Sequence, residues 1–495
     1  MSSNAPLMLS VSGCRGIVGR SLTPDVAARF AGCYGHFLRE RAGRDAATNA
    51  GKPIVVLGRD GRAGNQMLHH AAIAGLVGSG VDVVDVGVAM TPTVATATDA
   101  LGVRSKQMVA GMVLTASHNP QEWNGLKCLL AEGRDRFASA ACAPEAALAN
   151  SIVERFKTNV HTGVIWNEIG TVCHDDAATP THVARVLGAI EDAGICEDAS
   201  VLGEGFKIAA DSVNASGVAG CINAAESLGV DEFFHLGNNT SGLFPHPPEP
   251  TLDNLSAPGG LCDSVRNNNC VAGFAQDPDA DRLALIDETG AYIGEEYTLV
   301  LSTLAILEAM KRRGESTKGL TLAANLSTSR MLDDLAARYG CTVLRTAVGE
   351  ANVVSAMKSH QSLVGGEGNG GVIWPRVTYV RDSIAAIALT LGLLKMFKKP
   401  LSAIVKDMPA YAIVKRKVDL TDTSQAKVAS EKIAKHFASD RLDRQDGVRV
   451  DIESKRAWLH VRGSNTEPIM RLIAEAPTTE VANALLDEAA RVINA

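Results

Sequence analysis

The stretch Met108-Val-Ala-Gly-Met-Val-Leu-Thr-Ala-Ser-His-Asn-Pro120 joins a continuous apolar run to a polar loop. The apolar part is typical of a buried strand, and the Asn-Pro pair interrupts the regular backbone. The hydroxyl of Ser117 therefore follows the end of a strand, which is where α/β sheets usually place their ligands. The Gly-x-Ser-x-Gly pattern of a triad nucleophile is absent. A polar turn that caps the strand is thus the commoner explanation of these residues taken alone.

Strand-like and helix-like segments alternate on both sides of this loop, in a chain of 495 residues that is too long for one hydrophobic core. Such alternation predicts a doubly wound, mostly parallel α/β sheet. The pattern restarts near residues 206 and 294, and the segment after residue 400 reads as an α+β module. We therefore expect three consecutive α/β domains and a C-terminal α+β domain. Their expected limits are 1–164, 165–292, 293–400 and 401–495.

The composition is that of a soluble globular protein, with 46% hydrophobic, 21% charged and 4% aromatic residues and a formal net charge of −7. Without a basic face or many aromatic side chains, no nucleic-acid partner is expected. The ten cysteines include no Cys-x-x-Cys pair, which argues for reduced thiols rather than a zinc site or a disulfide framework. No signal peptide and no apolar run of membrane-spanning length is present, so we expect a cytoplasmic protein without membrane contact.

The stretch Asp277-Pro-Asp-Ala-Asp-Arg282 offers three carboxylates at alternate positions. The proline favours an extended backbone, so the three side chains can converge on one hard cation. Crowded carboxylates repel one another unless a cation neutralises them, and oxygen ligands suit Mg²⁺. An EF-hand is excluded because its downstream glycine and glutamate are missing. A solvated acidic turn is the alternative, and these residues alone leave it open.

Two further loops carry groups that suit a sugar phosphate. The stretch Arg462-Gly-Ser-Asn-Thr-Glu-Pro468 combines a guanidinium with hydroxyls, an amide and backbone N–H groups, all of which donate to phosphate oxygens. Glu367, among the glycines of residues 365–371, is an acceptor on backbone that a ligand can approach closely. Each loop taken alone is more commonly an ordinary turn.

Taken together, the four loops resemble those of the α-D-phosphohexomutase family, which includes phosphoglucosamine mutases and phosphomannomutase/phosphoglucomutases. They occur in the family's order and cover essentially the whole chain. The matching stretches are residues 115–120, 277–282, 366–370 and 462–468. The stretch Ser12-Gly-Cys-Arg-Gly-Ile17 is also similar to the family's N-terminal Gly-x-Arg-Gly signature.

The resemblance implies an enzyme whose active site lies in a central cleft, with one loop from each domain. Ser117 would be a phosphoserine that exchanges its phosphoryl group with a hexose monophosphate through a hexose 1,6-bisphosphate. One Mg²⁺ would bind the phosphate on Ser117 and three carboxylates, those of Asp277, Asp279 and Asp281. The substrate-binding residues would be Arg282, Glu367, Asn369, Arg462, Ser464, Asn465 and Thr466. A monomer or a homodimer that acts on sugar phosphates is expected.

The cations near the phosphoserine also have implied roles. Arg15 and Lys127 would match the charge of the phosphoserine, which is close to two negative charges. Lys127 or His118 would move the proton of the attacking or leaving hydroxyl. Electrostatic stabilisation alone is an equally good explanation for both residues. Arg282 would orient the carboxylates or touch the phosphate.

The sugar loop departs from the pattern of many family members, since Asn369 and Gly371 replace a serine and a histidine. This variant resembles a subgroup assigned as phosphoglucosamine mutases, so a hexosamine phosphate is favoured over glucose or mannose phosphate. Glu350 is a further candidate because a carboxylate suits an amine, although a glutamate at a helix start is common. A phosphatase and a catalytically silent sugar-phosphate-binding protein are the remaining alternatives.

Overall fold

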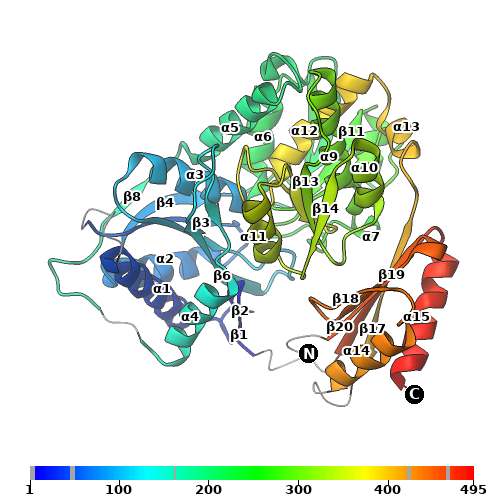
Figure 1. The fold of residues 1–495 in the computed structure, drawn as a ribbon. Helices are drawn as coiled ribbons and strands as arrows, with labels where there is room; N and C mark the ends of the chain where they lie inside the picture. Colours follow the sequence, from blue (N-terminus) through cyan, green and yellow to red (C-terminus); the bar gives the residue numbers. More distant parts are fainter. Residues whose placement is uncertain (1–5, 45–50, 161–162, 421–424, 464–468, 495) are drawn as a thin grey trace.

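The computed structural model describes residues 6–44, 51–160, 163–420, 425–463 and 469–494 (Figure 1). These residues form four sheets, each accompanied by helices. Figure 1 shows the first sheet in blue and cyan, the second and third together in green and yellow, and the fourth in orange and red, set apart from the others. The prediction of three α/β domains followed by a C-terminal α+β domain is confirmed.

The first sheet is mixed rather than mostly parallel. In spatial order its strands are β1 (Met8–Ser10), β2 (Gly13–Ile17), β6 (Trp123–Ala131), β5 (Val109–Leu114), β3 (Ile54–Arg59), β4 (Asp82–Val88) and β8 (Val172–His174), with β7 (Ala141–Cys142) beside β6. Strands β5, β3, β4 and β8 are parallel, whereas β6 returns antiparallel to β5. The connection from β5 to β6 is too short for a crossover helix, so only an antiparallel return is possible. The helices of this part are α1 (Pro24–Arg44), α2 (Asn65–Gly78), α3 (Thr91–Arg104) and α4 (Ala146–Lys157).

The second and third sheets share one topology. The second consists of β10 (Glu232–Leu236), β9 (Lys207–Asp211), β11 (Ala272–Gln276) and β12 (Leu283–Asp287). The third consists of β14 (Thr342–Thr346), β13 (Thr321–Asn325), β15 (Gly365–Glu367) and β16 (Gly371–Ile373). In both sheets three parallel strands are followed by one antiparallel strand, as in the order β4-β3-β5-β6 of the first sheet. The sequence reveals no such repeat, because a core position constrains apolar character more than residue identity.

This repeat places a polar loop at the same point in each unit, between the third strand and its antiparallel partner. Ser117 lies between β5 and β6, and the aspartates lie between β11 and β12. The third turn, residues 368–370, lies between β15 and β16. The structure corrects one expectation here, because residues 365–367 form a strand and not part of the loop. Their pairing with β13 and β16 outweighs the low strand propensity of glycine.

The second and third units share one hydrophobic core, whereas the first and fourth units each have their own. Helix α12 (Ser383–Phe397) lies at the centre of the shared core, with almost all its side chains buried. The other helices of these two units are α5 (Ala178–Asp192), η1 (Ala199–Val201), α6 (Gly217–Ser227), α7 (Leu252–Leu255), α8 (Leu261–Asn267), α9 (Glu296–Arg312), α10 (Met331–Tyr339), α11 (Glu350–His360) and α13 (Leu401–Lys406). Within the described ranges, no helix is long and apolar enough to cross a membrane.

The fourth sheet is antiparallel throughout. Its strands are, in spatial order, β17 (Ala412–Asp419), β21 (Ile469–Ala476), β20 (Ala457–Gly463), β19 (Val448–Ile452) and β18 (Arg441–Asp443). Its helices are α14 (Gln425–His436), α15 (Thr479–Asn494) and the short η2 (Glu453–Lys455). Ala429 and Ile433, four residues apart on one face of α14, are buried. Because α14 and α15 pack on one face, the other face can present polar side chains to the third unit.

Asp382 joins all three α/β units through a buried histidine. Its Oδ1 accepts hydrogen bonds from the N–H groups of Ile384 and Ala385, at 2.9 and 3.2 Å, and so caps α12. Its Oδ2 lies 2.9 Å from Nε2 of His182 in α5. The Nδ1 of His182 lies 2.9 Å from Oγ1 of Thr93 in α3.

Replacing Asp382 with alanine should therefore lower the thermal unfolding midpoint markedly. Loss of a helix cap costs about 1 kcal/mol, and a buried imidazole left without its partner costs about 1–3 kcal/mol. The sum corresponds to a shift of roughly 5–15 °C for domains of this size, measurable by scanning calorimetry. The control is Asp198→Ala, which removes the exposed cap of η1. Equal shifts in the two variants would show that the contact with His182 contributes nothing.

Candidate active site

Ser117 lies in a tight turn that its neighbours hold in an unusual backbone conformation. Its φ is +50°, a region that residues other than glycine seldom adopt. Its N–H donates to Oγ1 of Thr115 at 2.8 Å, and its carbonyl oxygen accepts from Nη2 of Arg62 at 2.7 Å. The side chain is buried, and Oγ donates to Oδ2 of Asp277 at 2.8 Å. The structure thus brings the Ser117 loop and the aspartate loop into direct contact.

Arg62, which sequence reasoning did not select, holds this turn through its hydrogen bond to the Ser117 carbonyl oxygen. The buried guanidinium pairs with Asp60, with Nε 2.9 Å from Oδ2, and lies 5.2 Å from the ring centroid of Phe244. Phe244 belongs to the long loop of residues 237–251, which joins β10 to α7. The side-chain amide of Gln121 makes two hydrogen bonds to this loop. It donates to the Gly242 carbonyl at 2.9 Å and accepts from the Phe244 N–H at 2.8 Å. The loop between β10 and α7 therefore docks on the Ser117 loop.

The carboxylates of Asp277, Asp279 and Asp281 converge, with ligand atoms that lie within 4.8 Å of one another, and all three residues are buried. One carboxylate oxygen of Asp279 and one of Asp281 accept hydrogen bonds from neighbouring side chains. Oδ2 of Asp279 accepts from Oγ1 of Thr91 at 2.7 Å, and Oδ2 of Asp281 accepts from Nη2 of Arg381 at 2.6 Å. Their Oδ1 atoms are buried and have no hydrogen-bond partner in the described part of the chain.

Burial and mutual repulsion shape the charge of this cluster. Burial raises the pKa of Asp277 well above its usual range, and the charges of Asp279 and Asp281 raise it further. Burial also acts to raise the pKa of Asp281, but Arg381 and Lys127 outweigh it and lower the pKa. A cation that bound the two unpaired oxygens would relieve both the repulsion and the missing hydrogen bonds. An all-carboxylate set of this kind fits a hard divalent cation such as Mg²⁺.

Arg15 and Arg282 approach the cluster from two units. Arg15 lies within strand β2, opposite Gly125 of β6. Its Nη1 donates to Oδ1 of Asn119 at 3.4 Å. Nε of Arg282 lies 3.9 Å from a carboxylate oxygen of Asp277 and of Asp281. Both guanidiniums therefore contribute positive charge beside Ser117.

Lys127 and His118 differ in their protonation. Nζ of Lys127 lies 3.3 Å from Asp281 and 3.9 Å from Glu350. Burial acts to lower its pKa, but the two carboxylates outweigh this and raise it, so the amine holds its proton at neutral pH. Nδ1 of His118 lies 3.4 Å from Oγ of Ser117. Burial, with the nearby arginines, lowers the pKa of His118 to about 3, so its imidazole is neutral.

Glu367 is held at the end of β15 by contacts to both of its carboxylate oxygens. Oε1 accepts from Nδ2 of Asn325 at 2.8 Å and from the N–H of Gly349 at 3.3 Å. Oε2 accepts from Nη1 of Arg381 at 2.8 Å. The next turn carries Asn369, whose Oδ1 has no hydrogen-bond partner among the described residues and which lines the adjoining cavity.

Arg381 is the main residue that sequence reasoning missed, because it belongs to no recognisable motif. Besides Asp281 and Glu367 it contacts Glu350, with Nε 2.8 Å from Oε2. One buried guanidinium therefore joins three carboxylates from two units. A Cβ atom on Gly371 would lie only 2.1 Å from Cδ of Arg381. Gly371, which replaces the histidine of many family members, is thus the sequence signal that a bulky side chain packs against this loop.

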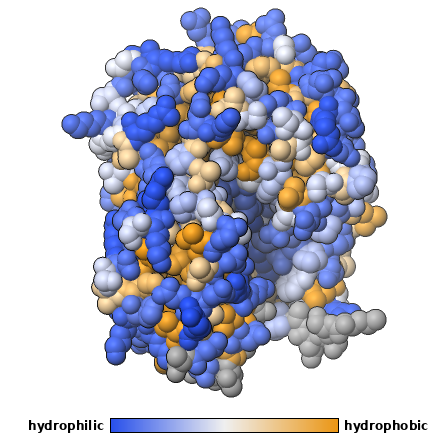
Figure 2. Space-filling model, turned by 90° about the vertical axis from the view of Figure 1, so that its right-hand side faces the viewer, coloured by the Kyte–Doolittle hydropathy of each residue, from blue (hydrophilic) through white to orange (hydrophobic). Residues whose placement is uncertain are grey.

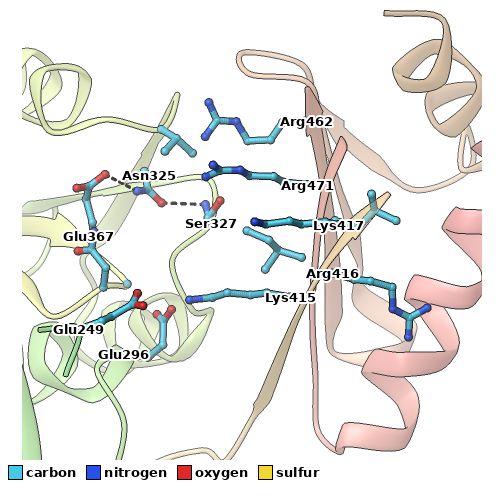
Figure 3. A pocket seen from close by; sticks show the side chains of 15 residues that line it. Glu249, Glu296, Asn325, Ser327, Glu367, Lys415, Arg416, Lys417, Arg462 and Arg471 are labelled. Carbon is cyan, nitrogen blue, oxygen red and sulfur yellow. Dashed lines mark hydrogen bonds between the residues drawn. The ribbon is translucent and has the colours of Figure 1, made fainter. Parts of the chain in front are cut away.

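A cavity of about 500 Å³ opens between the third and fourth units (Figure 3). Figure 3 shows cationic side chains of the fourth sheet pointing across it toward Glu249, Glu296 and Glu367. The space-filling view shows a hollow in the middle of this side of the molecule, lined largely by hydrophilic residues (Figure 2). The cations are Lys415, Lys417, Arg462 and Arg471.

Three of these cations form a row across adjacent strands. Lys417 of β17 and Arg462 of β20 are both register partners of Arg471 in β21, so the three side chains share one face of the sheet. Sequence reasoning had selected only Arg462, which lies near the end of β20 and within 3.2 Å of Asp446. The other predicted residues of this loop, Ser464, Asn465 and Thr466, lie outside the described residues.

Comparisons with known proteins agree along the whole chain. Four family models match, all described as phosphoglucomutase/phosphomannomutase: alpha/beta/alpha domain I over residues 8–143, domain II over 192–290, domain III over 301–411 and the C-terminal domain over 414–492. A probable phosphoglucosamine mutase of Methanopyrus kandleri is 33% identical, over 96% of this chain and 95% of its own length. A phosphoglucomutase/phosphomannomutase of Thermococcus kodakarensis is 32% identical, over 96% of both chains.

The fold is also found among solved structures. The crystal structure of a phosphoglucomutase/phosphomannomutase family protein from Burkholderia thailandensis superposes with a TM-score of 0.76. The match covers 98% of each chain at 23% sequence identity. At that identity the likeness establishes the four-unit fold alone.

Proposed function

Since this chain belongs to the phosphoglucomutase/phosphomannomutase family, we propose that it is a Mg²⁺-dependent phosphohexomutase that interconverts a hexosamine 6-phosphate and 1-phosphate. The observation that carries this proposal is the contact between Oγ of Ser117 and the buried aspartates, with Asp277 at 2.8 Å. A hydroxyl beside a cation site and several arginines is suited to carry a phosphoryl group.

The reaction is two phosphoryl transfers through Ser117. In the first, a hydroxyl oxygen of the sugar monophosphate bonds to the phosphorus on Ser117 as the bond from phosphorus to Oγ breaks. This yields a 1,6-bisphosphate and the free serine, and the proton of the sugar hydroxyl passes by way of a base to Oγ. In the second, the bisphosphate has turned round, and Oγ bonds to the phosphorus of its other phosphoryl group as the bond from that phosphorus to the sugar oxygen breaks. The proton that Oγ loses passes to the sugar oxygen. Mg²⁺ bound to the aspartates would neutralise charge on the transferred group.

The protonation of two residues suggests their roles in these transfers. His118 is neutral and lies 3.4 Å from Oγ of Ser117, and the negative charge of a phosphoserine beside it would raise its low pKa, so it would be placed to accept a proton. Lys127 holds its proton and would stabilise negative charge on the phosphoryl oxygens. Arg15 and Arg282 would add to that stabilisation.

The cavity between the third and fourth units suits the rest of the substrate. Arg462, Arg471 and Lys417 would bind the phosphate that does not react, and Ser464, Asn465 and Thr466 would complete that site. Glu367 and Asn369, on the opposite wall, would bind the sugar hydroxyls.

The choice of sugar is open to direct measurement. A phosphoglucomutase/phosphomannomutase of 32% identity makes glucose and mannose phosphates the second candidate substrates. We expect kcat/KM for glucosamine 1-phosphate to exceed the values for glucose and mannose 1-phosphate in parallel assays. A higher value for mannose or glucose 1-phosphate would favour the second candidate. Release of inorganic phosphate in place of the 6-phosphate would identify a phosphatase instead.

Arg381→Lys should lower kcat/KM by about 10- to 100-fold, the usual cost of losing a group that orients metal ligands. Lysine keeps the positive charge but cannot contact Asp281, Glu350 and Glu367 at once. Both KM for the sugar phosphate and the Mg²⁺ concentration for half activation should therefore rise. Arg416→Lys is the control, because Arg416 points away from the cavity toward Asp487 in α15. If only KM rises, Arg381 does not link the metal and sugar loops.

A further inference from the structure

A second cavity, of about 560 Å³, opens between the first and third units. Its walls come mainly from the connection between β6 and β7, from α9 and α11, and from the connection between β16 and α12. It shares no lining residue with the cavity between the third and fourth units, and neither Ser117 nor the three aspartates line it. Its volume is in the range of sites that bind small molecules.

Positive charge predominates around this cavity, although the whole chain carries a formal net charge of −7. Its cationic side chains are Arg134, Arg136, Arg313, Lys358 and Arg376. Its carboxylates are those of Asp135 and Glu315, and both already have partners. Oδ1 of Asp135 accepts from the N–H of Phe137 at 2.9 Å, and Oε1 of Glu315 lies 2.9 Å from Nε of Arg313. The other cations are therefore not neutralised by the cavity's own acidic groups.

Arg136 and Arg376 lie together without an acceptor for either guanidinium. Each guanidinium carbon lies 4.7 Å from the ring centroid of Phe137, and neither side chain has a hydrogen bond or an ion pair among the described residues. Burial lowers the pKa of Arg376; the charge of Asp192 opposes this, and the charges of Arg136 and Arg313 add to it. An anion in the cavity would supply both the missing acceptors and the compensating charge.

Lys358 adds a cation from a third element of the wall. Its Nζ donates to the carbonyl oxygens of Glu132 and Ala140, at 3.0 and 2.9 Å, and is paired with no carboxylate in the described part of the chain. Arg136, Lys358 and Arg376 thus come from three separate segments, which favours a ligand with more than one anionic group. A phosphate group offers several acceptor oxygens and can bind a guanidinium through two of them.

We propose that this cavity is a second ligand site, which binds an anion carrying two or more phosphate groups through Arg136, Arg376 and Lys358. The ligand would be an effector and not the substrate, because the cavity is separate from the Ser117 loop and the aspartates. The inference does not depend on the proposed mutase function. In the structural alternative, the two arginines only pack on Phe137 and remain solvated, and the cavity binds no anion.

The test is calorimetric titration with tripolyphosphate in the absence of divalent metal, which this anion would chelate. The full-length protein carries Arg462→Gln and Arg471→Gln throughout, so that the cation row of the other cavity does not contribute. Adding Arg136→Gln and Arg376→Gln should weaken binding about tenfold or more, as for loss of hydrogen bonds to a charged group. Adding Arg266→Gln and Arg444→Gln instead removes the same charge from exposed ion pairs with Asp263 and Glu431, and should leave the affinity unchanged.

A variant with the opposite sign separates binding from loss of the fold. Glu315→Gln removes a carboxylate from the cavity wall, so it should tighten binding of tripolyphosphate, an effect that a damaged fold would not produce. If the Arg136/Arg376 double variant does not fold, Arg136→Gln alone, at an exposed position, should still weaken binding several-fold.

Three results would overturn the inference. They are no binding of tripolyphosphate at millimolar concentration, an affinity that the cavity variants leave unchanged, and an equal loss of affinity in the Arg266/Arg444 control. Citrate, a carboxylate anion, is the comparison for ligand class. It should bind more weakly than tripolyphosphate, and equal or tighter binding would overturn the assignment to phosphate groups.

Discussion

Ser117→Ala should reduce kcat by about 10⁴-fold or more, the usual effect of removing a nucleophile that forms a covalent intermediate. Without Oγ no phosphoryl group can be held beside the aspartates, and no other described hydroxyl is hydrogen-bonded to Asp277. Intact mass provides an independent measurement. The purified parent should contain a species heavier by one phosphoryl group, and this species should be absent from the variant.

Two controls separate loss of the hydroxyl from loss of the fold. Alanine at a φ of +50° retains the strain of the turn, so Ser117→Gly, which relieves it, should be equally inactive. Ser139→Ala removes a buried hydroxyl that donates to the carbonyl of Pro375 far from the aspartates, and it should still be phosphorylated. Full activity of Ser117→Ala in the presence of a hexose 1,6-bisphosphate would refute the phosphoserine mechanism.

Asp279→Asn should lower kcat by about 10²- to 10³-fold at millimolar Mg²⁺, the scale expected for loss of one electrostatic stabiliser of the transferred group. Thr91 holds Oδ2 of Asp279, and Oδ1 has no hydrogen-bond partner among the described residues, so the substitution removes charge from an oxygen that is available to a cation. The Mg²⁺ concentration needed for half activation should rise strongly. An unchanged metal dependence would remove Asp279 from the proposed ligand set.

Thermal unfolding gives a readout that does not depend on turnover. A cation that binds only the folded protein raises its unfolding temperature in proportion to the logarithm of its concentration. Mg²⁺ should therefore stabilise the parent, and this stabilisation should be much smaller in Asp279→Asn. Asp85→Asn is the matched control, because Asp85 is buried and pairs with His69 at 2.9 Å, away from the aspartate cluster. It should keep the Mg²⁺ response of the parent.

Several elements were correctly predicted because their signals are local. The apolar run before Ser117 and the alternating carboxylates of residues 277–281 each lie within a few residues of sequence. Prediction was less accurate for strands that form only because another strand lies beside them. Residues 13–17 and 365–367 form strands because β6 and β13 lie beside them, and local propensity does not contain that information.

The residues that were missed have partners far along the chain. Arg381 contacts Asp281, which precedes it by 100 residues, and Arg62 supports Ser117 across 55 residues. Arg471 aligns with Lys417 only through the register of two strands. None of these arginines belongs to a motif whose spacing could have indicated its role.

The sequence by itself determined which chemical groups the protein brings to its site: a hydroxyl after a strand, three alternating carboxylates, a glutamate among glycines and an arginine-led loop. The tertiary structure decided which of these groups meet. It brought Ser117 into contact with Asp277 and set Arg381 between the aspartate and sugar loops. It also left two aspartate oxygens without hydrogen-bond partners among the described residues. The reason is physical. Backbone propensities act over a few residues, whereas hydrogen bonds and charge pairs in a buried site require contact and ignore separation along the chain.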